Sequence, residues 1–210
     1  GSMRGAKIDR LKQAMELAVG KLAPEDQVSV TIFNDSAQVI AKQAPLADQK
    51  GLLDKIRSMR AGGGTQMSRG MSLGLREVYR SFNERYSNQL LILTDGQTYG
   101  DESQCLKLAK EAGEHKIPIQ ALGLGDDWNE DLLDEIGKLS AGGSDLVAAP
   151  DEIVPTVPIT PTRPLRVVLT SARAPGPTTS ITGPPDTACW PFHSSSTEPT
   201  ASRPAARGVS

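Results

Sequence analysis

An uninterrupted apolar run near the middle of the chain constrains the fold most strongly. Residues 89–94 contain four consecutive large aliphatic side chains, Leu90, Leu91, Ile92 and Leu93. Successive side chains of a strand point to opposite faces, so a strand of this composition is buried on both sides. Strands of this kind lie in the middle of parallel sheets that helices cover on both faces. The run therefore predicts an α/β fold.

Helical and strand patterns alternate around this run. Apolar residues at steps of three and four predict helices at about residues 7–21, 52–59, 65–82, 102–114 and 129–139. Alternating or β-branched segments predict strands at about residues 27–33, 37–41, 117–122 and 145–148, and Asp151 can open a final helix that ends at Pro155. The order predicts a doubly wound, Rossmann-like, mostly parallel sheet with helices on both faces. Residues 37–41 form its one short antiparallel edge strand.

The start of the chain lacks one element of this fold. The chain begins with a helix, and its first strand, at residues 27–33, is followed by a hairpin. A doubly wound sheet places its first strand in the centre. We therefore expect the central first strand to be missing and its two neighbours to have unpaired backbone groups. Set against a typical net stability of about 5–15 kcal/mol, this loss predicts a marginally stable or aggregation-prone chain.

Composition changes abruptly at Pro155. Most of the chain's 15 prolines follow this position, lysine is absent from it onward, and the only acidic residues there are Asp186 and Glu198. We expect residues 1–154 to form the domain and residues 155–210 to be a disordered Pro/Ser/Thr-rich tail, because so few apolar side chains do not offset the entropy of ordering. Its single strand-like fragment is Leu165–Thr170. Two explanations stay open for the tail: a genuine linker, or sequence read out of frame after Pro155.

Charge, apolar content and cysteines exclude several functions. The net charge is −2 without a basic cluster, which argues against nucleic acid as a partner. No apolar run approaches the roughly 20 residues of a membrane span, and no signal peptide is visible, so we expect a cytoplasmic protein. Cys105 lies in a helical pattern, which indicates a buried thiol, and its distance from Cys189 is not a metal-binding spacing. Walker, dinucleotide-binding, Ser-His-Asp and Cys-His patterns are absent from the sequence, which argues against an enzyme.

Three short motifs carry the candidate chemistry. They are Gly-Ser-Met-Arg-Gly at residues 1–5, Gly-Gly-Gly-Thr at residues 62–65 and Leu-Thr-Asp-Gly at residues 93–96. All three lie at turns into helices or after strands, where ligands collect in a doubly wound sheet. Taken singly, each also has a simpler explanation: a cloning remnant, a helix cap at Thr65 and a plain turn at Asp95.

Together and in this order, the motifs resemble the von Willebrand factor type A family. In that family the first strand ends in Asp-x-Ser-Gly-Ser-Met, and a glycine-rich Thr and a Thr-Asp-Gly follow. The chain is similar to that pattern cut within its first motif, and residues 123–129 resemble bacterial members. The resemblance extends from Gly1 to about Val154. The family's leading Asp and first Ser have no counterpart in this chain.

The resemblance implies a metal-ion-dependent adhesion site. Ser2, Thr65 and Asp95 would surround a Mg²⁺ or Mn²⁺ ion, which this chain would hold weakly because one carboxylate is missing. Such an ion recruits a Glu or Asp side chain of a partner protein, so we expect a metal-dependent protein-binding module. The alternatives are a Mg²⁺-dependent enzyme, or an accessory domain of a chelatase- or ATPase-type assembly.

Overall fold

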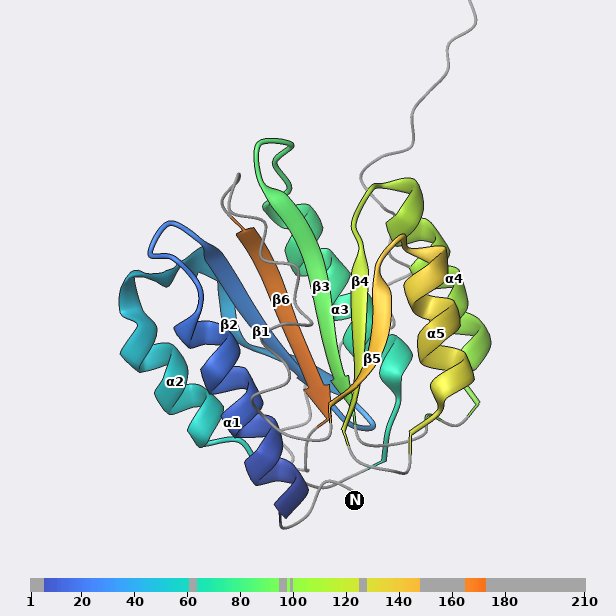
Figure 1. Cartoon of the computed structure of the whole chain (residues 1–210), viewed down its shortest axis with the longest axis horizontal. Helices are drawn as coiled ribbons and strands as arrows, with labels where there is room; N and C mark the ends of the chain where they lie inside the picture. Colours follow the sequence, from blue (N-terminus) through green and yellow to red (C-terminus); the bar gives the residue numbers. More distant parts are fainter. Residues whose placement is uncertain are drawn as a thin grey trace, which may run out of the picture. The chain divides into compact units, whose positions relative to one another are not determined.

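The chain folds around one six-stranded sheet (Figure 1). The computed structural model describes residues 6–60, 64–94, 98, 100–124, 128–147 and 165–172. The strand order is β2-β1-β6-β3-β4-β5. Among these strands only β2 runs antiparallel to its neighbour, whereas β1, β6, β3, β4 and β5 pair in parallel. This is the predicted α/β fold class with its antiparallel edge strand.

The secondary structure follows the sequence pattern closely. The helices are α1 (Ala6–Gly20), α2 (Gln49–Arg57), α3 (Met67–Arg80), α4 (Glu102–Glu114) and α5 (Glu130–Leu139), with a short 3₁₀ helix, η1 (Leu46–Asp48). The strands are β1 (Gln27–Phe33), β2 (Ala37–Pro45), β3 (Ser87–Thr94), β4 (Ile119–Leu124), β5 (Gly143–Val147) and β6 (Leu165–Ala172). The helix expected from Asp151 lies outside the described residues.

The central position of the sheet is filled from the far end of the chain. β6 lies between β1 and β3 and is parallel to both, as the brown arrow in Figure 1 shows. Its residues pair with Gln27–Phe33 on one side and with Ser87–Leu93 on the other. The expectation that the neighbours of the missing first strand would stay unpaired is therefore wrong.

β6 also lies within the segment that the sequence predicts to be a disordered tail. Disorder throughout residues 155–210 is wrong for Leu165–Ala172, which form β6, while the other residues after Val147 lie outside the described part of the chain. One compact unit extends from Gly1 to Pro177, so the sheet includes residues on both sides of the expected boundary at position 154. The strand-like pattern in this segment was the sequence signal for β6.

Helices cover both faces of the sheet. α1 and α2 lie together on one face, whereas α3 lies behind β3 in Figure 1 and packs against β1 and β6. Leu90, Leu91, Ile92 and Leu93 are all at most 1% exposed, as expected for a strand with two covered faces. α3 approaches β1 closely, because a Cβ on Gly70 would overlap the ring of the buried Phe33.

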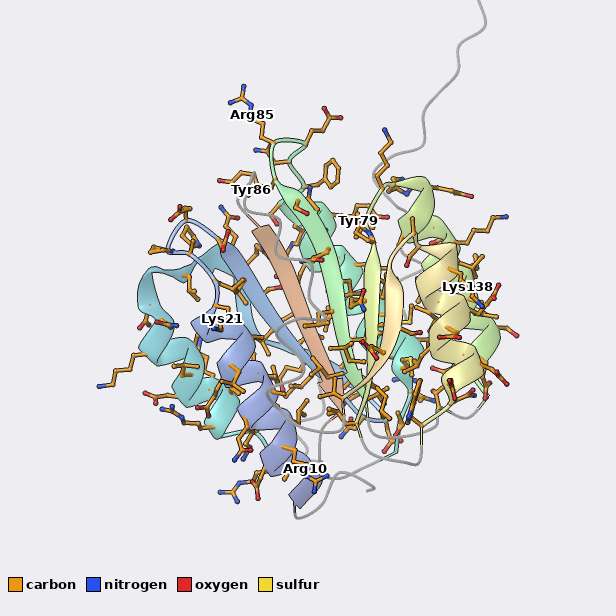
Figure 2. All side chains as sticks on the ribbon, viewed as in Figure 1. Arg10, Lys21, Tyr79, Arg85, Tyr86 and Lys138 are labelled. Atoms are coloured by element: carbon orange, nitrogen blue, oxygen red, sulfur yellow. The ribbon has the colours of Figure 1, made fainter. Side chains whose placement is uncertain are left out.

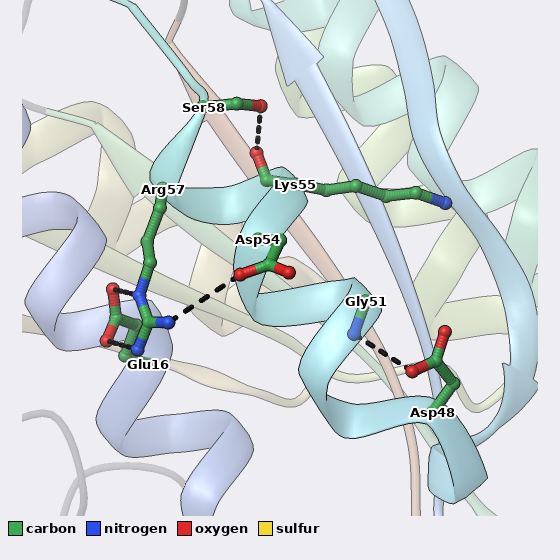
Figure 3. A network of polar contacts seen from close by, with 7 residues as sticks. All are labelled: Glu16, Asp48, Gly51, Asp54, Lys55, Arg57 and Ser58. Carbon is green, nitrogen blue, oxygen red and sulfur yellow. Dashed lines mark hydrogen bonds and ion pairs between the residues drawn. The ribbon is translucent and has the colours of Figure 1, made fainter.

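Charged side chains hold α1 and α2 together at the surface. Arg57 of α2 donates two hydrogen bonds to Glu16 of α1, Nε to Oε1 at 3.0 Å and Nη2 to Oε2 at 2.9 Å (Figure 3). The hydrogen bond and the charge of Glu16 raise the pKa of Arg57. Asp48 caps α2 by accepting a hydrogen bond from the Gly51 amide. Exposed ion pairs contribute little to stability, so this contact orients the helices more than it stabilises them.

Basic side chains are scattered over the surface. Arg10 and Lys21 lie toward opposite ends of α1, whereas Arg85 precedes β3 and Lys138 lies in the last turn of α5 (Figure 2). These four therefore form no single basic patch. The exclusion of nucleic acid as a partner stays a prediction.

Within the part of the chain that the structure describes, two buried hydroxyls of β1 have no hydrogen-bond partner. Ser29 and Thr31 are both 0% exposed, and the Oγ of Ser29 and the Oγ1 of Thr31 are unsatisfied. Both share the face of β1 that carries Phe33, which is the face under α3. Buried polar groups without partners carry an uncompensated desolvation cost. Ser140 is the contrasting case, since its buried Oγ accepts from the Ile119 amide at 3.0 Å and lies 2.9 Å from the Ile136 carbonyl.

Thr31→Val is expected to stabilise the chain. The substitution removes an unsatisfied hydroxyl at nearly constant shape, so we expect a gain of about 1 kcal/mol in the free energy of unfolding. Ser140→Ala is the matched control: it removes a satisfied hydroxyl and should cost about 1–3 kcal/mol. Urea denaturation of both variants measures the two values. A loss of stability in Thr31→Val would contradict the assignment.

Candidate functional site

The candidate site lies on the rim where the parallel strands end. β1, β6 and β3 run in the same direction, so their carboxyl ends meet at one edge of the sheet (Figure 1). The turn after β1, the glycine-rich loop before α3 and the connection from β3 to α4 all start or end at this edge. Ligands of doubly wound sheets bind at this rim.

Two hydrogen bonds attach the glycine-rich loop to the turn after β1. The Gln66 amide donates to the Asn34 carbonyl at 2.9 Å, and the Gly64 amide donates to Asp35 Oδ2 at 3.1 Å. A Cβ on Gly64 would overlap the Asp35 carboxylate, so glycine permits this approach. Thr65 is held between these two anchored residues.

A second set of hydrogen bonds attaches the same loop to the connection after β3. The Thr98 hydroxyl accepts from the Met67 amide at 3.2 Å and lies 2.9 Å from the Thr65 carbonyl. It also hydrogen-bonds with Asp101, whose other carboxylate oxygen accepts from the Ser68 amide at 2.8 Å. Thr98 is 1% exposed, so these bonds are shielded from water. The loop that carries Thr65 is therefore tied to the segment that carries Asp95.

These bonds also decide the role of Thr65. The N-cap of α3 is Gln66, and its side chain makes no capping bond. The first amides of the helix bond instead with Thr98 and Asp101. The simpler explanation of Thr65 as a helix cap is therefore wrong. Thr65 is half-buried, and its carbonyl lies 2.9 Å from the Thr98 hydroxyl.

Only one of the three predicted ligands lies in the described part of the chain. Thr65 lies at the rim, whereas Ser2 and Asp95 lie outside the described residues. Thr94, directly before Asp95, ends β3 and is fully buried. The structure thus brings Thr65 and the end of β3 to the same rim. The assignment of Ser2 and Asp95 as ligands stays a prediction.

The sequence did not reveal the residues that join these loops. Thr98, Asp101 and Asp35 bond across separations of about thirty positions in the chain. Asp101 does precede a helix, which is the usual signal for an acidic N-cap. Its side chain accepts a hydrogen bond from the first turn of α3 and none from α4. A single sequence does not show which of the two helices the carboxylate caps.

Three other residues have structural roles, and one of them is the buried thiol that the sequence predicts at Cys105. His115 ends α4, and its Nδ1 lies 2.8 Å from the Glu111 carbonyl. Trp128 packs on the end of β4, where a Cβ on Gly123 would overlap its indole ring. Cys105 is a buried free thiol, and burial raises its pKa, which keeps it protonated and unreactive.

The described residues contain neither a cluster of typical metal ligands nor a membrane-spanning helix. Across the ranges that the structure describes, no three His, Cys, Asp or Glu side chains gather in a metal-binding cluster. In the same ranges, every helix is too short or too polar to cross a membrane. The carboxylates of Asp35 and Asp101 lie at the rim, and each accepts a hydrogen bond from a backbone amide of the Thr65 loop or of the start of α3.

Comparison with known proteins decides the family. A family model described as the von Willebrand factor type A domain matches residues 1–151. The chain belongs to the von Willebrand factor type A family. Domains of this family are commonly metal-dependent protein-interaction modules.

Individual relatives agree with this assignment. An uncharacterized protein of Synechocystis is 31% identical over 157 residues, which cover 74% of this chain and 37% of that protein. The von Willebrand factor type A structure from Catenulispora acidiphila matches with a TM-score of 0.65 and 19% sequence identity. The match covers 74% of this chain and 38% of the Catenulispora chain. Proximal thread matrix protein 1 from the mussel byssus, whose structure is described with a zinc-occupied MIDAS motif, matches with a TM-score of 0.59 and 20% sequence identity. The match covers 70% of this chain and 37% of the mussel chain. This chain thus spans little more than a third of each.

Thr98→Val is expected to loosen the Thr65 loop. It removes the hydroxyl that accepts from the Met67 amide, so we expect a loss of about 1–3 kcal/mol in the free energy of unfolding and faster exchange of the Met67 and Ser68 amides. Ser58→Ala, which removes an exposed hydroxyl bonded to the Lys55 carbonyl, is the control and should change stability by about 0.5 kcal/mol or less. Denaturation and hydrogen exchange measure both effects; unchanged exchange at Met67 would contradict the network.

Proposed function

We propose that the chain is a divalent-metal-dependent protein-binding module. A Mg²⁺ or Mn²⁺ ion at the rim would recruit a Glu or Asp side chain of a partner protein. The observation that carries this proposal is the hydrogen-bond network of Thr98 and Asp101, which holds the Thr65 loop against the segment leading from β3 to α4. Residues distant in sequence are thereby kept together at the edge where this fold binds ligands.

The available groups fit a hard cation. Ser2 and Thr65 offer hydroxyl oxygens, and Asp95 offers a carboxylate, which are ligands that Mg²⁺ and Mn²⁺ prefer. Asp35 and Asp101 accept hydrogen bonds from the Gly64 and Ser68 amides, so their carboxylates position the segments on either side of Thr65. Zinc occupies the motif described for the mussel protein. The absence of His and Cys from the proposed ligand set favours the harder ions in this chain.

The ion would be held weakly. β6 occupies the central position, and its last residues, Ser171 and Ala172, lie beside Leu93 and Phe33 without adding a carboxylate to the rim. Ligand charge then depends on Asp95, and fewer charged ligands lower the affinity for a divalent cation. A cation with few anionic ligands stays electrophilic toward an incoming carboxylate.

Binding is favoured over catalysis. The sequence contains no Ser-His-Asp or Cys-His pattern, and His115 is committed to the end of α4. Cys105 is buried, and its raised pKa disfavours the thiolate. A carboxylate and two hydroxyls around an ion suffice to recruit an acidic group without further reactive residues.

Asp95→Asn is expected to lower the affinity for Mn²⁺ at least tenfold, because it removes the proposed site's only carboxylate. Asp54→Asn, on the surface of α2, is the matched control and should leave the affinity unchanged. Titration of the full chain followed by the electron paramagnetic resonance signal of free Mn²⁺ measures both. Equal affinity for the wild-type chain and Asp95→Asn would remove Asp95 from the site.

Partner binding separates the proposal from an enzyme. An immobilised glutamate-rich peptide is expected to retain the chain in Mg²⁺ and to release it in EDTA, whereas the same peptide with glutamine should not retain it. p-Nitrophenyl phosphate serves as a probe for Mg²⁺-dependent turnover. Turnover of this probe that Asp95→Asn abolishes, without metal-dependent retention on the glutamate peptide, would instead establish the enzymatic alternative.

A further inference from the structure

The position between β1 and β3 depends entirely on a strand from a distant part of the chain. β1 and β3 do not pair with each other, and both pair with β6 along seven consecutive residues. In the sequence β6 follows β5, which lies at the edge of the sheet beyond β3 and β4, three strand positions from β6. The strand that completes the centre is thus the last one of the sheet in chain order.

The two flanking strands form a slot with defined chemistry. On the β1 side, Val28, Val30 and Ile32 are at most 3% exposed, and on the β3 side, Leu90 and Leu91 are at most 1% exposed. The backbone amides and carbonyls of β1 and β3 that face the slot pair with β6 along seven residues on each side, and backbone groups inside a covered sheet require such partners. An extended apolar strand suits this position, since its backbone can pair on two sides and strands in the middle of a covered sheet are apolar on both faces. The Val-Val-Leu sequence of residues 167–169 matches these demands.

We propose that this slot is a strand-binding site, which residues 165–172 fill within one chain and which the same strand from a second copy fills by exchange. Every copy carries both the slot and the strand that fits it. Exchange therefore preserves all the pairings of β6 while linking two chains. The inference concerns the centre of the sheet and does not depend on the metal site.

The length of the connection between β5 and β6 determines whether β6 fills the slot of its own chain or that of a second copy. Residues 148–164 connect β5 to β6, and when extended they span roughly 55 Å. The route from the end of β5 to the start of β6 crosses three strand spacings and one strand length, roughly 30 Å in all. The chain can therefore fill its own slot, and a tethered strand acts at an effective concentration of about 1 mM. A strand from another copy competes only near that concentration, or when the chain's own strand is disabled.

The first test disables the strand within the full chain. Val168→Pro removes a backbone donor from the middle of β6 and is incompatible with a central strand. The probe is a fluorescent peptide with the sequence of residues 163–174, and the control is a scrambled peptide of the same composition. We expect the variant to bind the probe at least about 100-fold more tightly than the wild-type chain does, since the wild-type slot is occupied. Equal affinity for both chains, or for both peptides, would overturn the proposal.

A second test leaves β6 intact, so that a folding defect in Val168→Pro cannot obscure the answer. Ile92 of β3 lies opposite Thr170 of β6, so Ile92→Cys with Thr170→Cys, on a Cys189→Ser background, should form a disulfide. Leu91→Cys with Thr170→Cys is the control out of register and should not. After refolding at about 1 µM we expect a cross-linked monomer, and after refolding near 1 mM a substantial cross-linked dimer. Absence of the cross-link, or cross-linked monomer alone at both concentrations, would refute the exchange.

Discussion

Backbone pairing of β6 with both β1 and β3 is the interaction on which the sheet depends. β2 and β1 lie on one side of this strand, and β3, β4 and β5 lie on the other. Without it, the two halves would share no ladder, and buried amides and carbonyls on both facing edges would lack partners. Helix packing alone would then have to join the halves. A segment late in the chain therefore determines whether the earlier strands make one core.

The candidate site depends on this arrangement indirectly. The turn after β1 and the end of β3 belong to opposite halves of the sheet. The glycine-rich loop hydrogen-bonds with Asn34 and Asp35 in the turn after β1 and with Thr98 in the connection after β3. β6 sets the spacing between β1 and β3, and Thr98 and Asp101 then anchor the loop at that spacing. The rim that holds Thr65 is thus positioned by the centre of the sheet as well as by its own hydrogen bonds. Family membership and this geometry together support a binding role at the rim.

Buried hydroxyl groups differ in whether they have hydrogen-bond partners, and the difference depends on their place in the fold. Ser140 satisfies its hydroxyl at the junction of α5 and β4, and Thr98 does so at the rim. Ser29 and Thr31, under α3, leave theirs unsatisfied in the strand next to β6. Unsatisfied hydroxyls in so dry a core lower stability without adding a contact. The face of β1 under α3 is therefore less well satisfied in hydrogen bonds than the rim.

Local sequence determined the elements of this protein. The apolar run of β3, the N-cap at Asn129 and the end of α4 at His115 all follow from short-range rules, because each depends on residues within a turn or a strand. The motifs around Thr65 and Asp95 likewise identified the family and the edge at which to look for a site. Tertiary structure alone decided which segment fills the centre and which side chains hold the Thr65 loop. Strand pairing and capping across some thirty or more positions leave no periodic signal in a single sequence, because the backbone groups that pair are the same in every residue.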